Sequence, residues 1–422
     1  MSPSSDPAGG RGTGPATASA SRAESTDPVR ALLLRGGRVA GPTGTAVRDV
    51  LVVGAQVVAV DADLPGVRLP GVPVTEVDLA GRLVLPALVD QHSHPTGGGG
   101  GGGPHTQNLP IRFEQYTTAG IGTVVGCLGH DTVVRTHEAL LARVRALRAQ
   151  GLTGYLFTGE IGHPPATLTG DVRRDLALFD EVRGVKAAVG EVGAVGTVDE
   201  LRRLAGAVAR GSRTGGKPPV LHLHLGPDRR GVDLVARAVA DGLVPAAMVT
   251  VTHVNWNPDV LAAAIDLAHA GVGVDVTACI RPDYFPGAVP PHRAVAELLD
   301  RVPVEQVTVT SDAGGAHPHD GALVPHRPVL LLDVLRHCLA DRVAPPHLLA
   351  AVFAGNAARR LGLTGVGTVT PGGRADLLVV DGSGREPITL LLGGRTVVEA
   401  GVPTVTDPVG DPPAPDPVEA PV

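Results

Sequence analysis

The sequence predicts an α/β protein: a (β/α)8 TIM barrel with a small β-sandwich domain formed by the N- and C-terminal segments. Between residues 83 and 364, short runs rich in valine and leucine alternate with segments whose apolar residues recur every three or four positions. That alternation indicates buried parallel strands, each followed by a helix. Eight such units favour a closed barrel over an open doubly wound sheet. β-like runs on both sides of this region predict that the two ends of the chain pair into one smaller domain.

The N-terminal part is expected to contain a tail and then the first part of the β-sandwich. Residues 1–29 are mostly Ser, Pro, Gly, Ala and Thr, which predicts a disordered tail. Residues 30–82 contain short β-like runs, separated by turns at Gly36-Gly37, Gly54 and Gly81, and predict a small antiparallel layer. The expected strands are Ala31–Arg35, Asp49–Val53, Gln56–Val60 and Val74–Asp78.

Residues 83–364 are expected to form the catalytic barrel. The predicted strands are Leu83–His92, Gly122–Cys127, Gly154–Thr158, Val185–Val189, Val220–Leu225, Met248–Val254, Gly271–Val276 and Val307–Ser311. The helical patterns between them include Glu138–Arg148, Asp199–Val208, Leu234–Ala240, Val260–Ala270 and His292–Leu299.

After a helix around Leu348–Leu361, residues 365–406 are expected to complete the β-sandwich, and residues 407–422 to form a flexible tail. The predicted strands of this second part are Gly367–Val369, Ala375–Val380, Ile388–Leu392 and Arg395–Val398.

Composition narrows the possible partners. Lys and Arg total 36 against 42 Asp and Glu, and no basic stripe is present, so a nucleic-acid partner is not expected. Cys127, Cys279 and Cys338 are odd in number and widely scattered, which argues against a disulfide framework. No signal-peptide or membrane-span pattern is apparent, so we expect a cytoplasmic protein without a membrane partner.

The most informative motif is Asp90-Gln91-His92-Ser93-His94, at the end of the first predicted barrel strand and just before a glycine tract, residues 97–103. On a strand, His92 and His94 point to the same side, because side chains alternate with a period of two. Two imidazoles leaving the C-terminal end of a buried parallel strand make a candidate metal site.

Other strand ends add metal-ligating or ionisable side chains: Lys186 on strand four, His222 and His224 on strand five, His253 on strand six and Asp312 on strand eight. Each has an ordinary alternative, a hydrogen-bonded core histidine or, for Ser311-Asp312, a helix cap. Lys186 is harder to explain, because burying an unpaired ammonium costs several kcal/mol. It needs a carboxylate partner or a modification such as carbamylation, which turns the cation into a metal-bridging anion.

Together these positions resemble the amidohydrolase superfamily, from about residue 31 to 405. Further matches are Gly355-Asn356-Ala357-Ala358 and the segment from Pro371 to Leu377. Within the superfamily the chain is most similar to the isoaspartyl (β-aspartyl) dipeptidases. The similar segments are Asp90–His94 with its glycine loop, Gly120–Leu128, Gly184–Lys186, Thr252–Asn255 and Thr308–Asp312.

By this resemblance, His92, His94 and Asp312 would hold one zinc ion, His224 and His253 the second, and carbamylated Lys186 would bridge them. Asp312 would also be the catalytic residue that takes a proton from the attacking water and delivers it to the leaving nitrogen. His222 is interpreted as a core residue or one that supports the ligands. We also expect a homo-oligomer.

The resemblance weakens in the loops that would hold a substrate. The family's acidic residue in the glycine loop aligns with Gly101, and its two arginines align with Gly193 and Trp256, although Asn255 is kept. A tyrosine and a serine of the family align with Ile161 and Ala316. Losing such buried contacts should alter specificity. Replacement polar groups could be His105, Glu160, His163, Glu191, Arg229, Arg281 or Tyr284, each of which is as readily an ordinary loop residue.

Three hypotheses stay open. The first is a binuclear zinc hydrolase acting on a small amide, either an isoaspartyl dipeptide or another N-acyl amino acid. The second is a hydrolase of cyclic amides, like hydantoinases or dihydroorotases. The third is a non-catalytic scaffold, which predicts eroded ligands, whereas all six ligand positions are intact.

Overall fold

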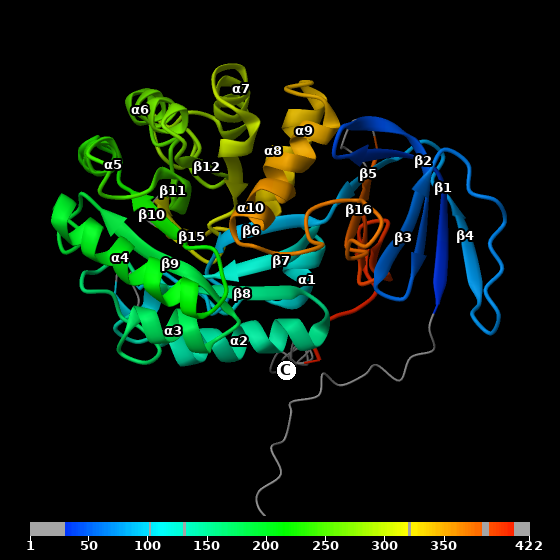
Figure 1. The fold of residues 1–422 in the computed structure, drawn as a ribbon, viewed down its shortest axis with the longest axis horizontal. Coiled ribbons are helices and arrows are strands. Elements are labelled where there is room, and N and C mark those ends of the chain that lie inside the picture. Colours follow the sequence, from blue (N-terminus) through cyan, green and yellow to red (C-terminus); the bar gives the residue numbers. More distant parts are fainter. Residues whose placement is uncertain (1–29, 101–102, 130–131, 320–321, 382–387, 409–422) are drawn as a thin grey trace, which may run out of the picture.

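The structure, a computed structural model, describes residues 30–100, 103–129, 132–319, 322–381 and 388–408. It has two parts, a barrel surrounded by helices and a small β-sheet that lies to one side of it (Figure 1). The predicted tails, residues 1–29 and nearly all of 407–422, lie outside the described residues.

The predicted barrel is confirmed. Eight parallel strands follow one another in sequence order, from β6 to β13. The strands are β6 (Leu88–Ser93), β7 (Ile121–Gly126), β8 (Thr153–Gly159), β9 (Val182–Val189), β10 (Leu221–Leu225), β11 (Val249–Thr252), β12 (Gly273–Thr277) and β13 (Val307–Thr310).

Helices cover the outside of the barrel (Figure 1). They are α1 (Phe113–Thr117), α2 (His137–Gln150), α3 (Val172–Leu178), α4 (Val198–Thr214), α5 (Arg230–Ala240), α6 (Pro258–His269), α7 (Pro291–Arg301), α8 (Val329–Ala340) and α10 (Asn356–Arg360). Helix α9 (Pro346–Ala350) instead contacts β1, β2 and β5 of the small sheet, and a π-helical turn, Ala351–Gly355, joins it to α10. A hairpin of β14 (Ala316–His319) and β15 (Ala322–Pro325) follows β13.

Helix α4 illustrates why these segments fold as they do. Thr197 accepts a hydrogen bond from the backbone N–H of Glu200, and the Glu200 side chain accepts one in return from Thr197, which forms a capping box. Leu201, Leu204 and Val208 then lie on one face and are buried. Because apolar residues at this spacing form one stripe, α4 packs against the barrel and leaves its charged face in water.

The barrel closes between its first and last strands. Ser93 and Ala313 form a parallel bridge, the backbone N–H of His94 donates to the Ala313 carbonyl, and the N–H of Asp312 donates to the His92 carbonyl. The seam therefore brings the His92–His94 pair beside Asp312, although more than two hundred residues separate them in sequence.

The second domain is one mixed sheet of nine strands, built from both ends of the chain as predicted. Its strands are β1 (Ala31–Gly41), β2 (Gly44–Val53), β3 (Gln56–Asp61), β4 (Val74–Asp78), β5 (Leu83–Pro86), β16 (Leu377–Val380), β17 (Thr389–Leu392), β18 (Arg395–Glu399) and β19 (Val402–Pro403).

Several local predictions for this sheet are wrong. The layer is not purely antiparallel, because β1 pairs in parallel with β4 and β5. The predicted strand Leu83–His92 is two strands, of which β5 belongs to the small sheet and β6 to the barrel. Gly36-Gly37 is a bulge inside β1 rather than a turn, and Gly367–Val369 is not a strand. In these cases the pairing between distant strands, rather than the local sequence, determines where each strand begins, ends and pairs.

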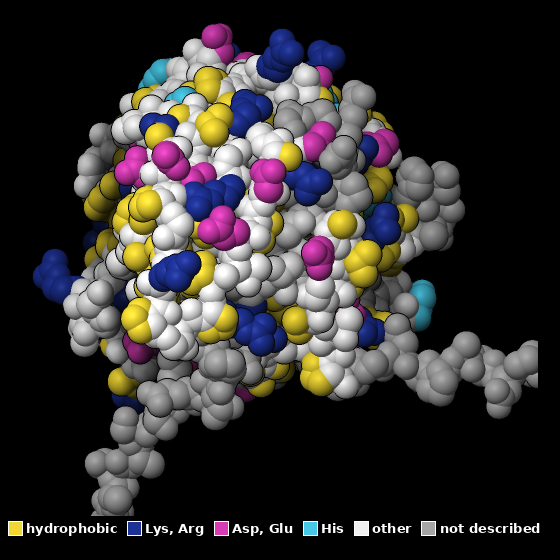
Figure 2. Space-filling model, turned by 90° about the vertical axis from the view of Figure 1, so that its right-hand side faces the viewer, with side chains coloured by type: hydrophobic (Ala, Val, Ile, Leu, Met, Phe, Trp, Pro, Cys, Tyr) yellow, Lys and Arg dark blue, Asp and Glu magenta, His cyan; other side chains and the backbone are white. Residues whose placement is uncertain are grey.

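Within the described ranges, none of the helices combines the length and the apolarity that a membrane crossing would need. On the side of the small sheet, Lys and Arg side chains are interspersed with Asp and Glu rather than gathered by sign (Figure 2).

Candidate active site

Six side chains predicted from the strand ends converge at the C-terminal mouth of the barrel. His92 lies in β6 and His94 just after it, Lys186 lies in β9 and His224 in β10, and His253 and Asp312 follow β11 and β13. All six line one cavity of about 940 Å³. That volume is at the large end of the range for small-molecule sites.

The first group joins the two histidines of strand one to Asp312. Oδ1 of Asp312 lies 3.1 Å from His94 Nε2 and 3.4 Å from His92 Nε2. The other ring nitrogens face away: His94 Nδ1 lies 2.9 Å from the Cys127 carbonyl oxygen, and His92 Nδ1 lies 2.9 Å from His222 Nε2. A histidine whose second nitrogen is engaged in this way has its ring orientation fixed, as metal-ligating histidines usually do.

His222 lies one layer deeper than His224, as its position in the strand predicts. It is fully buried, it stacks on Phe157 at 5.1 Å between ring centroids, and it contacts His92 from behind. It does not line the cavity. Its contribution to the site is therefore to hold the His92 ring.

The second group consists of His224 and His253, whose ring centroids are 4.5 Å apart. His253 Nδ1 lies 2.8 Å from the Thr277 hydroxyl, so its Nε2 is turned toward the cavity. His224 Nε2 lies 3.6 Å from Glu191 Oε1.

Lys186 lies against the first group and is only 1% exposed. Its Nζ is 3.0 Å from His92 Nε2 and 3.6 Å from Cys127 Sγ. Among the described residues, its hydrogen-bond partners are therefore an imidazole and a thiol rather than a carboxylate. A buried ammonium with such neighbours is unfavourable unless an anion joins it.

Burial determines the charge of these groups. Desolvation, and then the nearby Lys186, hold the pKa of His92 well below its usual value, and desolvation and His224 do the same for His253. Both imidazoles are therefore neutral, the form that binds metal. Burial raises the pKa of Asp312, but the contacts with His326 and His94 outweigh it and leave that pKa well below its usual range.

The backbone is unusual at two of the predicted ligands. His253 and Asp312 have φ angles of 71° and 53°, in the left-handed region that residues with side chains seldom adopt. Such conformations cost free energy and cluster at functional sites. Gly314 lies next to this turn with φ of 89°, and a Cβ there would be 2.4 Å from the His94 carbonyl oxygen, so only glycine fits.

A network below the site supports these loops. The buried carboxylate of Asp275 accepts hydrogen bonds from the hydroxyls of Thr252, Thr308 and Thr310, at 2.7, 2.6 and 2.6 Å, and from Gln91 at 3.3 Å. It therefore connects β6, β11, β12 and β13 directly beneath the ligand loops.

The chain is similar to known proteins and to solved structures, although no family model matches it. An imidazolonepropionase of Salinispora arenicola is 26% identical over 369 residues, which is 80% of this chain and 88% of that protein. An allantoinase of Rubrobacter xylanophilus is 26% identical over 457 residues, 90% of this chain and 96% of that protein.

Among solved structures, a β-aspartyl dipeptidase of Fervidobacterium islandicum is 26% identical, with a TM-score of 0.79, over 88% of this chain and 98% of that chain. The same enzyme has been solved with a bound β-Asp-Leu dipeptide. The chain belongs to the amidohydrolase superfamily. A dihydropyrimidinase of Brevibacillus agri, at 16% identity and a TM-score of 0.65, shares the fold.

In this amidohydrolase the donor set fits a divalent metal centre. Imidazole and carboxylate are groups that borderline ions such as zinc prefer. The buried Lys186, which contacts no carboxylate among the described residues, would join them once carbamylation makes it an anion. We therefore treat His92, His94, Lys186, His224, His253 and Asp312 as the candidate ligands.

Only some of the residues predicted to bind the substrate line the cavity. Trp256 and Glu191 line the cavity, and the Trp256 indole N–H donates to the Leu225 carbonyl at 2.7 Å. Asn255 does not line the cavity. Its side chain donates to three backbone carbonyls, including that of Ile280 at 2.7 Å, and fixes the loops after β11 and β12. Gly101 lies outside the described residues.

Glu160 and Arg281 also lie away from the lining of the cavity. Glu160 accepts a hydrogen bond from the Thr132 hydroxyl. Arg281 forms an ion pair of 2.6 Å with Asp283 and lies over the Tyr284 ring. Neither residue is placed by the structure to meet a substrate at the metal-ligand cluster.

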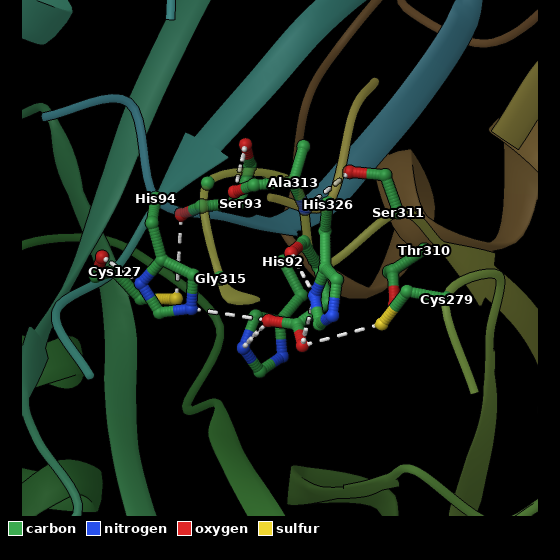
Figure 3. Close-up of polar contacts among 12 residues, drawn as sticks. His92, Ser93, His94, Cys127, Cys279, Thr310, Ser311, Ala313, Gly315 and His326 are labelled. Carbon is green, nitrogen blue, oxygen red and sulfur yellow. Dashed lines mark hydrogen bonds and ion pairs between the residues drawn. The ribbon is translucent and has the colours of Figure 1, made fainter. Parts of the chain in front are cut away.

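Sequence reasoning missed two residues that contact Asp312. Cys279 Sγ and His326 Nδ1 each lie 3.5 Å from Asp312 Oδ2, and both line the cavity (Figure 3). Burial, and then the Asp312 carboxylate, raise the pKa of Cys279 well above its usual value. The only sequence signal for either was residue type, since neither lies at the end of a predicted strand that bears a ligand.

Proposed function

We propose that this chain is a binuclear zinc-dependent hydrolase that cleaves the amide bond of a small substrate, related to β-aspartyl dipeptidases but with a different preference at the substrate's charged ends. The observation that supports this most directly is the convergence of His92, His94, Lys186, His224, His253 and Asp312 on one cavity. The similarity to a β-aspartyl dipeptidase over nearly the whole chain supports the reaction class.

His92, His94 and Asp312 would hold one ion, His224 and His253 the other, and carbamylated Lys186 would join them. Such ions supply the Lewis acidity that polarises an amide carbonyl and acidifies water. The residues of the chain do the rest. Asp312 takes the proton of the attacking water and passes it to the leaving nitrogen. Trp256 and Phe285, with ring centroids 5.0 Å apart, form a wall that keeps bulk water from one side of the cavity.

The charge of the cavity supports an altered substrate. A β-aspartyl dipeptide carries two carboxylates and one ammonium, each of which needs a buried partner. Apart from Lys186, the described residues that line the cavity include no lysine or arginine, and Trp256 stands where the family has an arginine. The wall that Trp256, Ile280 and Phe285 form suits an apolar or aromatic group instead.

Because Gly101 aligns with the acidic residue that meets the substrate amine in the family, we expect weaker turnover of plain β-aspartyl dipeptides than of substrates whose amine is acylated or absent. The test is kcat/KM for β-Asp-Leu divided by that for its N-acetyl derivative, with a ratio below one expected. A ratio far above one would mean that an acidic side chain that lines the cavity, Glu191, has taken over the amine contact. The proposed change of specificity would then be rejected, while the hydrolase itself would stand.

A matched pair of variants sharpens the test. Trp256→Arg restores the positive charge that the family has at this position and should raise kcat/KM for β-Asp-Leu at least about tenfold, because a substrate carboxylate gains a buried charged partner worth more than one kcal/mol. Trp256→Phe loses the same hydrogen bond to Leu225 but keeps the apolar wall, so it should leave kcat/KM for β-Asp-Leu nearly unchanged.

A cyclic amide is the second candidate substrate. The 26% identity to an allantoinase over 90% of the chain favours it. Measuring kcat/KM for hydantoin and dihydroorotate beside the linear amides separates the two candidate substrate classes. Only the cyclic-amide hypothesis predicts that a ring amide is the best substrate.

A further inference from the structure

The carboxylate of Asp312 faces two different groups of side chains. Oδ1 points to the His92 and His94 imidazoles, whereas Oδ2 points to Cys279 and His326. Figure 3 shows Cys279 and His326 on the side away from His94. The proposed reaction uses the first group, and it assigns nothing to Cys279 or His326.

The second group has the spacing of a metal site. Cys279 Sγ, His326 Nδ1 and an Asp312 oxygen all lie within 4.8 Å of one another. A tetrahedral zinc ion, with bonds of about 2.3 Å to sulfur and about 2.0 Å to oxygen, holds those two atoms about 3.5 Å apart. The distance from Cys279 Sγ to Asp312 Oδ2 is 3.5 Å. The donors therefore already stand at the separation that such an ion requires.

Backbone hydrogen bonds hold both new donors in place. The residue before Cys279, Ala278, donates from its N–H to the Thr310 carbonyl at 2.8 Å, and the His326 N–H donates to the Gly315 carbonyl at 2.8 Å. His326 Nε2 lies 3.1 Å from His317 Nδ1. With the proton on Nε2 and donated to His317, Nδ1 presents its lone pair to the group. The other tautomer would donate from Nδ1 to the Asp312 backbone carbonyl at 3.2 Å.

We propose that Cys279, His326 and Oδ2 of Asp312 form an additional site for a soft divalent cation of the zinc or cadmium class, whose occupation inhibits the enzyme. All three residues line the cavity, so a fourth coordination position is open to it. The cation replaces the thiol proton of Cys279, which leaves to solvent, and forms the metal–sulfur bond. A thiolate in the donor set selects soft ions over magnesium or calcium.

Inhibition follows from the shared carboxylate. An ion bound to Oδ2 occupies an oxygen that Asp312 needs in order to accept and release a proton. This part of the inference rests on the proposed function, whereas the metal site itself does not.

The experiment compares cadmium binding to the purified full chain and to four variants: Cys279→Ser, His326→Gln, Cys127→Ser and Cys338→Ser. Cys338 is a matched control, a buried thiol in α8 away from the cavity. Bound metal is measured by equilibrium dialysis and elemental analysis, and the thiolate–cadmium bond by its ultraviolet charge-transfer absorbance. Inhibition by excess zinc is measured alongside.

We expect the parent and Cys338→Ser to bind about one cadmium more per chain than Cys279→Ser and His326→Gln, with the charge-transfer band lost in Cys279→Ser. The inhibition constant for excess zinc should rise at least about tenfold in Cys279→Ser, since even mutations outside the ligand shell reduce metal affinity by that factor. If Cys279→Ser does not fold, His326→Gln supplies the same comparison.

Equal cadmium content in parent and Cys279→Ser would overturn the site. A band that depends on Cys127 instead would also overturn it, because it would place the thiolate beside His92 and His94. An extra ion without inhibition would overturn the inhibitory role. The test compares the cadmium content of the parent with that of each variant, so it can be interpreted even if the His92–His94 group binds no metal. Absence of metal from that group would refute the proposed function and not the additional site.

Discussion

Lys186 is the residue on which the proposed metal centre depends most. Its ammonium is buried and touches a neutral imidazole and a thiol, so carbamylation would replace an unfavourable cation by an anion between the two histidine groups. We expect the parent protein, purified without chelator, to contain about two zinc-class ions per chain. Lys186→Ala should lose at least one of them and nearly all activity, and short carboxylic acids in the buffer should restore part of the activity.

The matched control is Lys217→Ala. Lys217 is also largely buried, but its Nζ donates to the Phe179 and Val182 carbonyls, far from the cavity. Its removal should lower stability and leave metal content unchanged. A Lys186→Ala protein with the metal content and activity of the parent would show that no bridge exists. Absence of metal from the parent, even after zinc and bicarbonate are added, would refute the binuclear centre.

At this scale the sequence predicts the main cluster well and its surroundings poorly. His92, His94, Lys186, His224, His253 and Asp312 were identifiable because strand ends of a parallel barrel meet at one face. Cys279 and His326 were not, because Cys279 follows a strand without a ligand and His326 reaches the site through a hairpin. Asn255 follows a ligand strand as expected, but its side-chain amide donates to backbone carbonyls, which the sequence does not reveal.

Among the elements, β12 contributes the residue that holds the barrel's upper layer together. Asp275 is fully buried and accepts hydrogen bonds from side chains of three other strands. Removing it leaves several buried hydroxyls without their acceptor. We expect Asp275→Ala to lower the free energy of unfolding by about 3–5 kcal/mol, and Asp275→Asn by less, because the amide oxygen still accepts. Urea unfolding, followed by circular dichroism at equal metal content, measures both.

Asp233→Ala is the control for this series. Asp233 lies on the exposed face of α5, and within the described ranges its ion-pair partner is Arg229. Its loss should change stability by less than about 0.5 kcal/mol. A similar small change for Asp275→Ala would mean that the strands hold their positions without the carboxylate.

Element by element, the barrel was more predictable than the small sheet. Strand and helix patterns of the barrel repeat, and each unit packs on its neighbour, so local periodicity and final structure agree. In the small sheet, partners come from distant segments. The run Leu83–Val89 has one continuous apolar texture, yet β5 pairs with β16 and β6 pairs with β7, a division that only tertiary pairing determines.

At the scale of the whole molecule, the two ends of the chain complete one another. β5 lies between β1 and β16, with Leu83–Pro86 paired to Leu377–Val380. Leu378, Ile388 and Leu390 also belong to the main hydrophobic core that includes the barrel strands. The C-terminal arm is therefore part of the core of both domains rather than an appendage.

This arrangement predicts the outcome of truncation. Ending the chain after residue 364 removes β16 to β19, exposes the edge of β5 and leaves the apolar side chains beneath the arm in contact with water. Because an exposed apolar edge strand is a template for aggregation, we expect the truncated chain to be insoluble or to lose cooperative unfolding. Ending it after residue 408 keeps the ion pair of Arg143 with Asp407 and should change neither solubility nor thermal midpoint. Size-exclusion chromatography and thermal melts of the two truncations decide the matter. A soluble chain ending at residue 364 that still melts cooperatively would show that the barrel and the N-terminal strands of the sheet fold without the C-terminal arm, and that the arm's share of the core is not required for stability.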